Sequence, residues 1–509
     1  MAVEASTRKA LQNASSPEIG QPVSAPNVWS IVAAVALAAF YLATTLYIAS
    51  HRLFWSDELF TIHVARLTNW LTIWKALAHA VDSQPPIYYI VVRVFDKLFR
   101  PSEVAVRLPS VLAMVVGLLL TFDCARRLTD GVHGLIALSV LTCSFLPYYG
   151  YEARPYAISF MLAAVALWVW TNARLNKKWS AILFGSVLFV AVTIHYYAVL
   201  LVVPYALYEL SRWRPRQSPS QKLIAGVFGV TVPAALLSPL ILSFARQFSA
   251  GFWGHPSFYL LMKVFSDLFP AGLFLLALMM AWIVLVCGED RNIDLRAMQP
   301  GEAVGWFCLC IPLAGFVAAE KTNAFAAQYF IGALPGVAVA FSCCVWRHFH
   351  NTLRVSLGVF LLLASAGVAK QVAVSRTLEL ADRFGLQSAT RGYLGLEDSL
   401  RKDSKRFMLF ESPYLAGLYL GSEYYSKHPE ECILLLSSDA AQEGSWVQGT
   451  VLNLAQYYPV RFWRLDDLKT HARDTALIAP TPATLDAMRL AGFNTEVRFS
   501  KPLEVVYLK

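Results

Sequence analysis

The chain has 509 residues, of which 57% are hydrophobic and only 15% are charged. Soluble globular proteins carry about 25% charged residues, so this composition and a mean hydropathy of +0.49 indicate a membrane protein. The net charge of +9 does not point to nucleic acid, because Lys and Arg gather in the cytoplasmic loops of proteins with many spans. The sequence also lacks a basic patch interleaved with aromatic residues, so we expect no nucleic-acid partner.

The amino-terminal segment 1–27 is polar and precedes an apolar run at about 28–48. A cleaved secretory signal has a shorter apolar region followed by a cleavage site, so we predict a cytoplasmic tail followed by an uncleaved signal anchor. Seven of the eight cysteines lie in or at the ends of apolar runs. Their placement offers neither a disulfide framework nor a CxxC metal site.

Apolar runs of about 20 residues recur as far as residue 370, each long enough to cross a bilayer core of about 30 Å. Together they predict a polytopic α-helical transmembrane domain over 28–372. We expect eleven spans, at 28–49, 104–122, 132–149, 156–171, 179–194, 197–210, 223–243, 264–287, 302–319, 329–346 and 352–372.

The loops between these spans differ in charge on the two sides of the membrane. One set is rich in Lys and Arg, whereas the short loops of the other set hold only Arg154, Arg246, Lys263 and Lys321. The positive-inside rule makes the first set cytoplasmic, which places the long first loop (50–103) and residues 373–509 outside. Without disulfides or a eukaryotic targeting signal, the chain fits a bacterial cytoplasmic (inner) membrane best.

The composition becomes mixed polar from about residue 375. Short apolar runs at 407–410, 432–436 and 476–479 predict strands, and the patterns at 412–427 and 481–490 predict helices between and after them. Residues 496–508 alternate and predict an edge hairpin. The tail 373–509 is therefore expected to be a small α/β domain with a partly parallel sheet, which shapes or recognises an acceptor.

A pair of carboxylates, Asp57 and Glu58, follows the first span directly. An ionised carboxylate beside hydrocarbon is costly, so its presence suggests a function such as proton transfer or metal binding. Trp70, Trp74 and Leu77 then share one face of a short amphipathic helix, which suits the membrane interface. The pair alone would fit an acidic start to a surface helix, but its context favours a site.

Four further outer segments carry residue types that suit a site. In chain order they are Ser83-Gln84-Pro85-Pro86-Ile87-Tyr88-Tyr89, Arg107-Leu108-Pro109-Ser110, Tyr151-Glu152-Ala153-Arg154-Pro155-Tyr156-Ala157 and His195-Tyr196-Tyr197. With the acid pair, this order resembles the GT-C glycosyltransferases over roughly 28–345. The nearest branch is that of the protein mannosyltransferases and the lipid A aminoarabinose transferases. The tail carries no motif of this family.

The resemblance implies a GT-C fold and a glycosyltransferase that works at the outer face of the cytoplasmic membrane. A sugar on a polyprenyl-phosphate carrier would pass to a hydroxyl acceptor, which could be a protein, a lipid or a cell-surface glycan of the cell envelope. The transfer would invert the anomeric carbon. Polyprenyl-phosphate sugar, membrane lipid and the acceptor are the partners it implies.

The resemblance also assigns roles to residues. Asp57 is expected to be the general base, which works best when its pKa is raised toward the working pH. Glu58 is expected to orient the site, and Glu152 to contact the sugar or, with Asp57, to hold a divalent cation. Some relatives use a metal and others do not, so the cofactor stays open.

The leaving phosphate needs donors and positive charge, because stabilising developing charge is often the largest catalytic contribution. Arg154, Lys321, Arg107 and His195 are the candidates. Many relatives have an arginine where this chain has Gln328, which brings no charge, so either Lys321 takes over the phosphate or donor binding is altered. The substrate loop is expected to use Pro85, Pro86, Tyr88 and Tyr89.

Simpler structural roles remain open for several of these residues. Glu152 and Arg154 could form a plain ion pair, and Arg107 and His195 could anchor the chain at the interface. The rival functions are a transporter or flippase of lipid-linked sugars, a membrane scaffold whose tail binds partners, and an oligosaccharide polymerase or ligase.

Overall fold

The computed structural model describes residues 28–99, 102–172, 175–212, 218–248, 254–268, 298–382, 385–411, 416–435, 450–451, 453–501 and 503–508. The expected cytoplasmic tail 1–27 and most of the expected span 264–287 lie outside the described residues.

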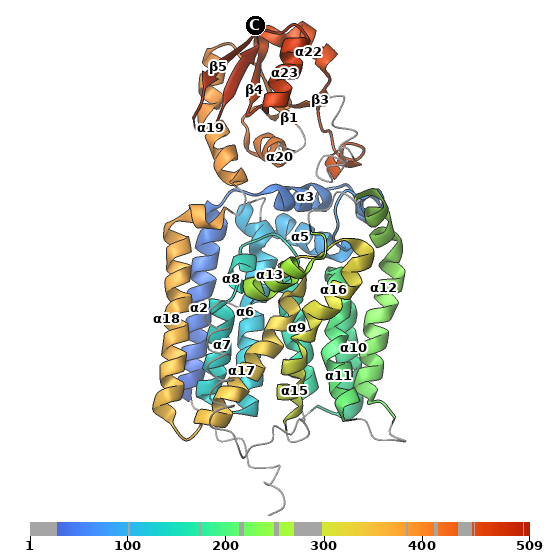
Figure 1. The fold of residues 1–509 in the computed structure, drawn as a ribbon, viewed down its shortest axis with the longest axis vertical. Coiled ribbons are helices and arrows are strands. Elements are labelled where there is room, and N and C mark those ends of the chain that lie inside the picture. The colour runs from blue at the N-terminus through green and yellow to red at the C-terminus, as the bar shows by residue number, and fades with distance from the viewer. Residues whose placement is uncertain are drawn as a thin grey trace, which may run out of the picture.

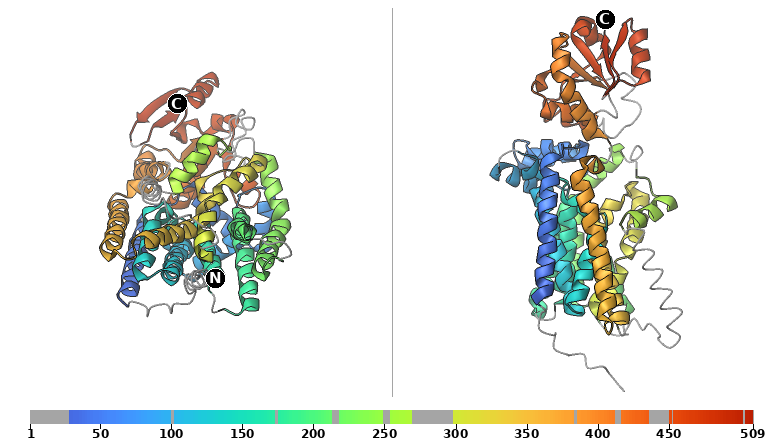
Figure 2. Two further views of the ribbon diagram at one scale, coloured as in Figure 1. Left: turned by 60° about the horizontal axis from the view of Figure 1, so that its bottom comes forward. Right: turned by 90° about the vertical axis from the view of Figure 1, so that its left-hand side faces the viewer.

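Apolar helices run side by side along one axis of the molecule and form a bundle (Figure 1). Figure 2 shows α2 and α18 packed along one side of it, as their direct contacts confirm. The helices of the bundle are α2 (Val28–His51), α6 (Glu103–Leu128), α7 (Gly131–Cys143), α8 (Leu146–Gly150), α9 (Tyr156–Thr171), α10 (Lys177–Ile194), α11 (Val203–Ser211), α12 (Gln221–Phe248), α15 (Pro300–Phe307), α16 (Cys310–Thr322), α17 (Leu334–Phe349) and α18 (Leu353–Arg376).

The described residues contain seven helical stretches that are long and apolar enough to cross a membrane, and three shorter apolar ones. The expected spans at 197–210 and 329–346 each begin with a tight 3-10 segment, η1 (Tyr196–Val202) and η3 (Ala327–Ala333), before the α-helix proper. The polytopic helical architecture is confirmed. The number of spans stays a prediction, because the eighth expected span, 264–287, falls mostly outside the described residues.

The first outer loop folds into three helices, α3 (Ser56–Ala65), α4 (Trp70–Ala78) and α5 (Pro86–Leu98). Helix α3 lies across one end of the bundle, which we call the α3 end (Figure 1). Asn69 caps α4 by accepting from the Thr72 N–H at 2.9 Å, and Pro86 opens α5, where a missing N–H does no harm. On α4 the expected apolar face is divided, since Trp70 is exposed and Leu77 is buried.

A separate α/β unit stands beyond the α3 end of the bundle (Figures 1 and 2). Its six strands run in the order β3-β2-β1-β4-β6-β5; β3, β2, β1 and β4 are parallel to one another, and β6 pairs antiparallel with both β4 and β5. The strands are β1 (Phe407–Glu411), β2 (Cys432–Leu435), β3 (Phe462–Trp463), β4 (Thr475–Ile478), β5 (Thr495–Phe499) and β6 (Val505–Leu508). The helices are α19 (Leu386–Lys402), α20 (Ala416–Tyr425), α22 (Leu465–His471) and α23 (Pro482–Leu490).

The expected α/β character of the tail is therefore confirmed. Strands β1, β2 and β4 are buried along most of their length, as continuous apolar runs in a parallel sheet should be, and the final hairpin forms at one edge. Thr481 caps α23 by accepting from the Thr484 N–H. Strand β3 was not predicted from the sequence because it is only two residues long.

A last helix, α13 (Phe258–Leu268), lies across the bundle near the α3 end (Figure 1). Its residues Phe258 and Tyr259 are exposed, whereas Leu261 and Val264 are buried. This division suits a helix that lies in the membrane interface rather than one that spans it.

Candidate active site

A buried ion pair fixes the start of the first outer loop. The Glu58 carboxylate accepts two hydrogen bonds from Arg107, from Nε at 2.8 Å and from Nη2 at 2.7 Å. Both side chains are fully buried. Glu58 also accepts from the backbone N–H groups of Ala153 at 2.8 Å and Trp55 at 3.3 Å. The carboxylate thus joins α3, α6 and the segment before α9.

The remaining N–H groups of Arg107 donate to backbone carbonyls at the end of the first span. Its Nη1 donates to the carbonyls of Ala49 at 2.7 Å and Arg52 at 2.6 Å, and its Nη2 donates to that of Leu53 at 3.0 Å. Burial would raise the pKa of Glu58, but the neighbouring guanidiniums and hydrogen bonds outweigh it and hold that pKa below its usual range. Glu58 is therefore ionised and structurally engaged, and Arg107 faces protein on all its donors.

A second buried cation lies beside this pair. Arg52 comes within 3.6 Å of the Glu152 carboxylate and donates to the Tyr151 carbonyl at 3.3 Å. The Gln387 amide oxygen, on α19, can accept from Arg52 Nε at 2.6 Å and Nη2 at 2.9 Å. Glu152 is thus paired with Arg52 and fully buried. Sequence reasoning missed Arg52, although it is the last cation before the acid pair.

Asp57 lies on a different side of α3 from Glu58. Its carboxylate faces Arg154, with Oδ2 3.7 Å from Nη2, and its side chain keeps about 21% of its surface exposed. Arg154 Nη1 donates to the Asp57 carbonyl and to the Thr61 hydroxyl, each at 3.2 Å. The guanidinium is buried and so fixes the first turn of α3 from below.

The same guanidinium binds a carboxylate that sequence reasoning did not single out. Arg154 Nη1 donates to Asp82 Oδ2 at 2.9 Å, and Asp82 is itself mostly buried. Its other oxygen accepts from the Ser83 N–H at 2.6 Å, which holds the turn before the two prolines. The available signal was an acidic residue in the outer loop, three positions before Pro85. Arg154 thus stands between Asp57 and Asp82.

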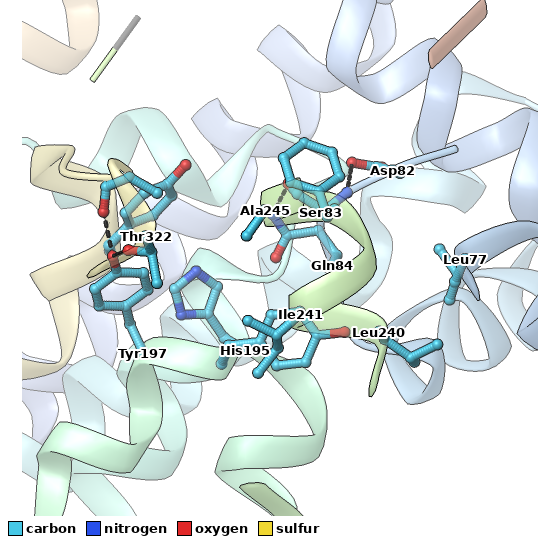
Figure 3. A pocket seen from close by; sticks show the side chains of 14 residues that line it. Leu77, Asp82, Ser83, Gln84, His195, Tyr197, Leu240, Ile241, Ala245 and Thr322 are labelled. Carbon is cyan, nitrogen blue, oxygen red and sulfur yellow. Dashed lines mark hydrogen bonds between the residues drawn. The ribbon is translucent and has the colours of Figure 1, made fainter. Parts of the chain in front are cut away.

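A pocket opens beside Asp82 (Figure 3). It encloses about 710 Å³ of empty space, including its open mouth. One wall is apolar and comes mainly from α12, whereas the other carries polar side chains from the first outer loop, η1 and the end of α16. The apolar lining residues are Leu77, Leu240, Ile241, Phe244, Ala245 and Ala324, and the polar ones are Asp82, Ser83, Gln84, His195, Tyr196, Tyr197, Thr322 and Tyr329.

Gln84, His195 and Tyr197 point into this cavity (Figure 3). The Gln84 side chain is buried, and its amide oxygen has no hydrogen-bond partner among the described residues. Burial and the nearby Arg154 charge lower the pKa of His195 to about 3, so the imidazole is neutral at physiological pH. Tyr197 stacks on Tyr329 with ring centroids 5.0 Å apart. The polar end of the pocket therefore offers mostly uncharged hydrogen-bonding groups.

The other expected site residues take different places. Lys321 is exposed on the last turn of α16, one residue before the pocket-lining Thr322. Gln328 is buried in η3, next to Tyr329. Pro85 and Pro86 form the start of α5, and Tyr88 and Tyr89 are fully buried on that helix and are not among the residues that line the pocket.

Among the expected site residues, His195 lines the pocket directly, Asp57 and Arg154 are linked to it through Asp82, and Gln328 and Lys321 each adjoin a lining residue. The structure engages Glu58, Arg107 and Glu152 in a buried network beneath. Within the part of the chain that the structure describes, no cluster of three or more His, Cys, Asp or Glu side chains could hold a metal ion. Asp57 and Glu152 are the residues expected to hold a divalent cation together. Each is paired with a different arginine: Asp57 faces Arg154, and Glu152 faces Arg52.

The buried pair yields a prediction about stability. Glu58→Gln leaves the Arg107 charge buried without its counter-ion, which in proteins costs about 3–5 kcal/mol. We expect the variant to lower the thermal unfolding midpoint in detergent by many degrees or to abolish folding. The matched control is Asp398→Asn, which removes an exposed partner of Lys427 and should leave the unfolding midpoint close to that of wild type. Equal stability of the two variants would contradict the assigned role of the pair.

Comparisons of sequence and structure bear on the family and the fold of the protein. Residues 83–242 match the model of the dolichyl-phosphate-mannose-protein mannosyltransferase family. No curated protein sequence gives a significant match. The fold is similar to the crystal structure of ArnT from Cupriavidus metallidurans bound to undecaprenyl phosphate, with a TM-score of 0.59 at 14% identity over 95% of this chain and 98% of that chain.

The apo structure of the same ArnT gives a TM-score of 0.59 at 13% identity, over 94% of this chain and 97% of that chain. At such low identity the likeness establishes the fold, and it extends over both the bundle and the tail. The resemblance inferred from the outer-loop motifs is thereby confirmed: the protein is a multi-pass membrane protein with the GT-C glycosyltransferase fold and a small C-terminal α/β domain.

Proposed function

We propose that this protein transfers a sugar from a polyprenyl-phosphate carrier to a hydroxyl acceptor, with Asp57 as the general base. The observation that carries the proposal is the chain of contacts from Asp57 through Arg154 to Asp82. It places a partly exposed carboxylate one buried guanidinium away from a pocket with an apolar wall and a polar end. The fold shared with a protein that binds undecaprenyl phosphate supports the same assignment.

The pocket has an apolar wall and a polar end, and this combination suits a lipid-linked sugar donor. The apolar wall, with Leu240 and Phe244, would receive the first part of the polyprenyl chain, where burying each CH₂ contributes about 0.8 kcal/mol. The opposite end, with Gln84 and His195, would receive the sugar and phosphate. The unpaired Gln84 oxygen can accept from a sugar hydroxyl, and a buried unpaired oxygen is costly unless a ligand satisfies it.

The reaction is a single displacement. Asp57 takes the proton of the acceptor hydroxyl as the acceptor oxygen forms its bond to the anomeric carbon. The bond from that carbon to the phosphate oxygen breaks on the opposite side, and its electron pair leaves with the polyprenyl phosphate. The anomeric carbon is inverted. Asp57 can serve as the base because its side chain reaches solvent, whereas the carboxylate of Glu58 is fully buried and held by Arg107.

The charges near the pocket divide the remaining roles. Arg154 is shared by two carboxylates and does not line the pocket, so we assign it to fixing Asp57 and Asp82 rather than to a direct phosphate contact. Lys321 brings an exposed positive charge to the rim beside Thr322 and would meet the phosphate. We assign Arg107 a positioning role in place of the expected phosphate contact, because its donors are spent on Glu58 and three carbonyls.

The same proposal includes the orientation of the protein. With the amino terminus in the cytoplasm of a bacterium, the α3 end and the tail would face outward, and the donor would be used at the outer face of the cytoplasmic membrane. The short basic loops would then lie inside, as the positive-inside rule requires. The sugar and the class of acceptor stay open.

Asp57→Asn should abolish transfer without disturbing the fold. The amide cannot accept the acceptor proton, so we expect turnover to fall by at least about 100-fold. The measurement is sugar release from radiolabelled polyprenyl-phosphate mannose, glucose, arabinose and aminoarabinose by purified protein in lipid, with a cell-envelope extract supplying acceptors. Asp466→Asn, on an exposed pair with Lys469 in the tail, is the matched control and should retain full activity.

Two results of this assay would count against the proposed function. Equal turnover by wild type and Asp57→Asn would remove Asp57 from the mechanism. Folded wild type that binds a donor and moves it across vesicle membranes, without releasing sugar to any acceptor, would favour the transporter or flippase function instead.

We expect His195 to contribute a hydrogen bond to donor binding and to keep the same protonation state during turnover. Because its pKa is about 3, the imidazole is almost entirely neutral from pH 5 to 8. We expect His195→Asn to raise the KM for donor by about fivefold, the equivalent of one lost hydrogen bond, and to leave the shape of the pH–rate profile unchanged. Loss of an acidic or basic limb from that profile in the variant would show that His195 does titrate during turnover.

A further inference from the structure

Helix α3 is buried on every side, although it lies at the end of the bundle. Eight consecutive residues, Glu58–Ala65, are buried. Contacts with Arg107 and Arg154 cover only the side toward the bundle. A helix buried all round needs a second surface to pack against. Here that surface belongs to the C-terminal domain (Figure 1).

Helix α20 supplies this surface through one row of residues. The Phe54 N–H, just before α3, donates to the Tyr425 hydroxyl at 2.9 Å, and the Phe54 ring stacks on Tyr425. Gly421 brings α20 close to α3, since a Cβ there would lie 3.6 Å from the Leu59 side chain. The contact therefore reaches the backbone that leads into Asp57.

A contact between a histidine and a carboxylate joins the middle of α3 to the same helix. His63 is buried, its Nδ1 lies 2.7 Å from the Leu59 carbonyl, and its Nε2 lies 3.4 Å from the Glu423 carboxylate. The Glu423 side chain is about 9% exposed. Tyr458, from a later segment of the tail, packs edge-on against the His63 ring with centroids 4.4 Å apart. His63 and Glu423 are 360 residues apart in the chain, so only the docked tail brings them together.

The tail also contacts two other elements around the pocket. The Tyr457 hydroxyl hydrogen-bonds to His79 Nδ1, at the end of α4 and three residues before Asp82. Asn453 donates to Gln247 at 3.1 Å, near the end of α12, whose preceding turns line the pocket. The tail therefore contacts the element that carries the base, the segment before Asp82, and the helix that forms the apolar wall.

We propose that the C-terminal domain positions the catalytic helix, with Glu423 and Tyr425 as its positioning residues. The inference rests on the proposed function of Asp57. By holding α3 from outside while Arg107 and Arg154 hold it from the bundle, α20 keeps Asp57 at a fixed distance from the pocket. A shift of about 1 Å in a catalytic group can cost about 100-fold in rate, so this contact governs kcat rather than donor binding.

The test uses full-length protein in lipid and pairs of variants on one helix. Tyr425→Phe removes the acceptor for the Phe54 N–H and keeps the ring, whereas Tyr424→Phe removes a hydroxyl that only faces Arg66 at 3.5 Å. Glu423→Ala removes the partner of His63, whereas Glu423→Gln keeps a group that can hydrogen-bond to it. Lys427→Gln, whose partner Asp398 lies within the tail, is the surface control.

We expect Tyr425→Phe and Glu423→Ala to lower kcat by about 5- to 20-fold, with the donor KM changed less than about twofold. Glu423→Gln should recover most of the loss, and Tyr424→Phe and Lys427→Gln should remain near wild type. An unchanged kcat in both Tyr425→Phe and Glu423→Ala, beside an active wild type, would overturn the inference. An increase in donor KM alone would overturn it as well.

Hydrogen–deuterium exchange of the same proteins separates this inference from the proposed function. Peptides that cover residues 54–65 should exchange faster in Glu423→Ala and Tyr425→Phe than in wild type, whether or not a donor is found. Unchanged exchange there would overturn the positioning role. An inactive wild type with the expected exchange pattern would instead count against the proposed function alone and support the contact between the tail and α3.

Discussion

The buried pair between Glu58 and Arg107 is the constraint on which the site depends. It ties the first turn of α3 to α6, to the end of the first span and to the segment before α9, all at one fully buried position. Two opposite charges can be buried like this only when their remaining hydrogen-bonding groups are satisfied, and here backbone groups on both sides do so. Because Glu58 is fixed, the neighbouring Asp57 is fixed on the other side of the same helical turn.

Two adjacent carboxylates thus have opposite environments and opposite tasks. Glu58 is fully buried and holds the structure, whereas Asp57 is partly exposed and faces Arg154. Arg154 then connects Asp57 to Asp82, which lines the pocket, so the proposed base and the proposed donor pocket are linked through one guanidinium. The tail completes the arrangement from the other side of α3. Under the proposed function, these contacts hold the proposed base rigidly near the pocket.

Much of this could be read from the sequence, and the remainder depends on long-range contacts. Apolar run length gave the helical bundle, alternating strand and helix patterns gave the tail, and the outer-loop motifs pointed to Asp57 and Arg154. The sequence could not show that Arg107 binds Glu58, because the two residues lie 49 positions apart and either could face substrate. Arg52, Asp82 and the docking of α20 on α3 were missed for the same reason, since none of their partners is near in sequence.

The most direct test of the account is the configuration of the product, measured by NMR with a polyprenyl-phosphate sugar of defined anomeric configuration. A single base beside one displacement predicts that the product has the opposite configuration from the donor. Retention would contradict the account. It would require a covalent glycosyl intermediate on a carboxylate, with Asp57 or Asp82 as nucleophile, in place of an acceptor activated by Asp57.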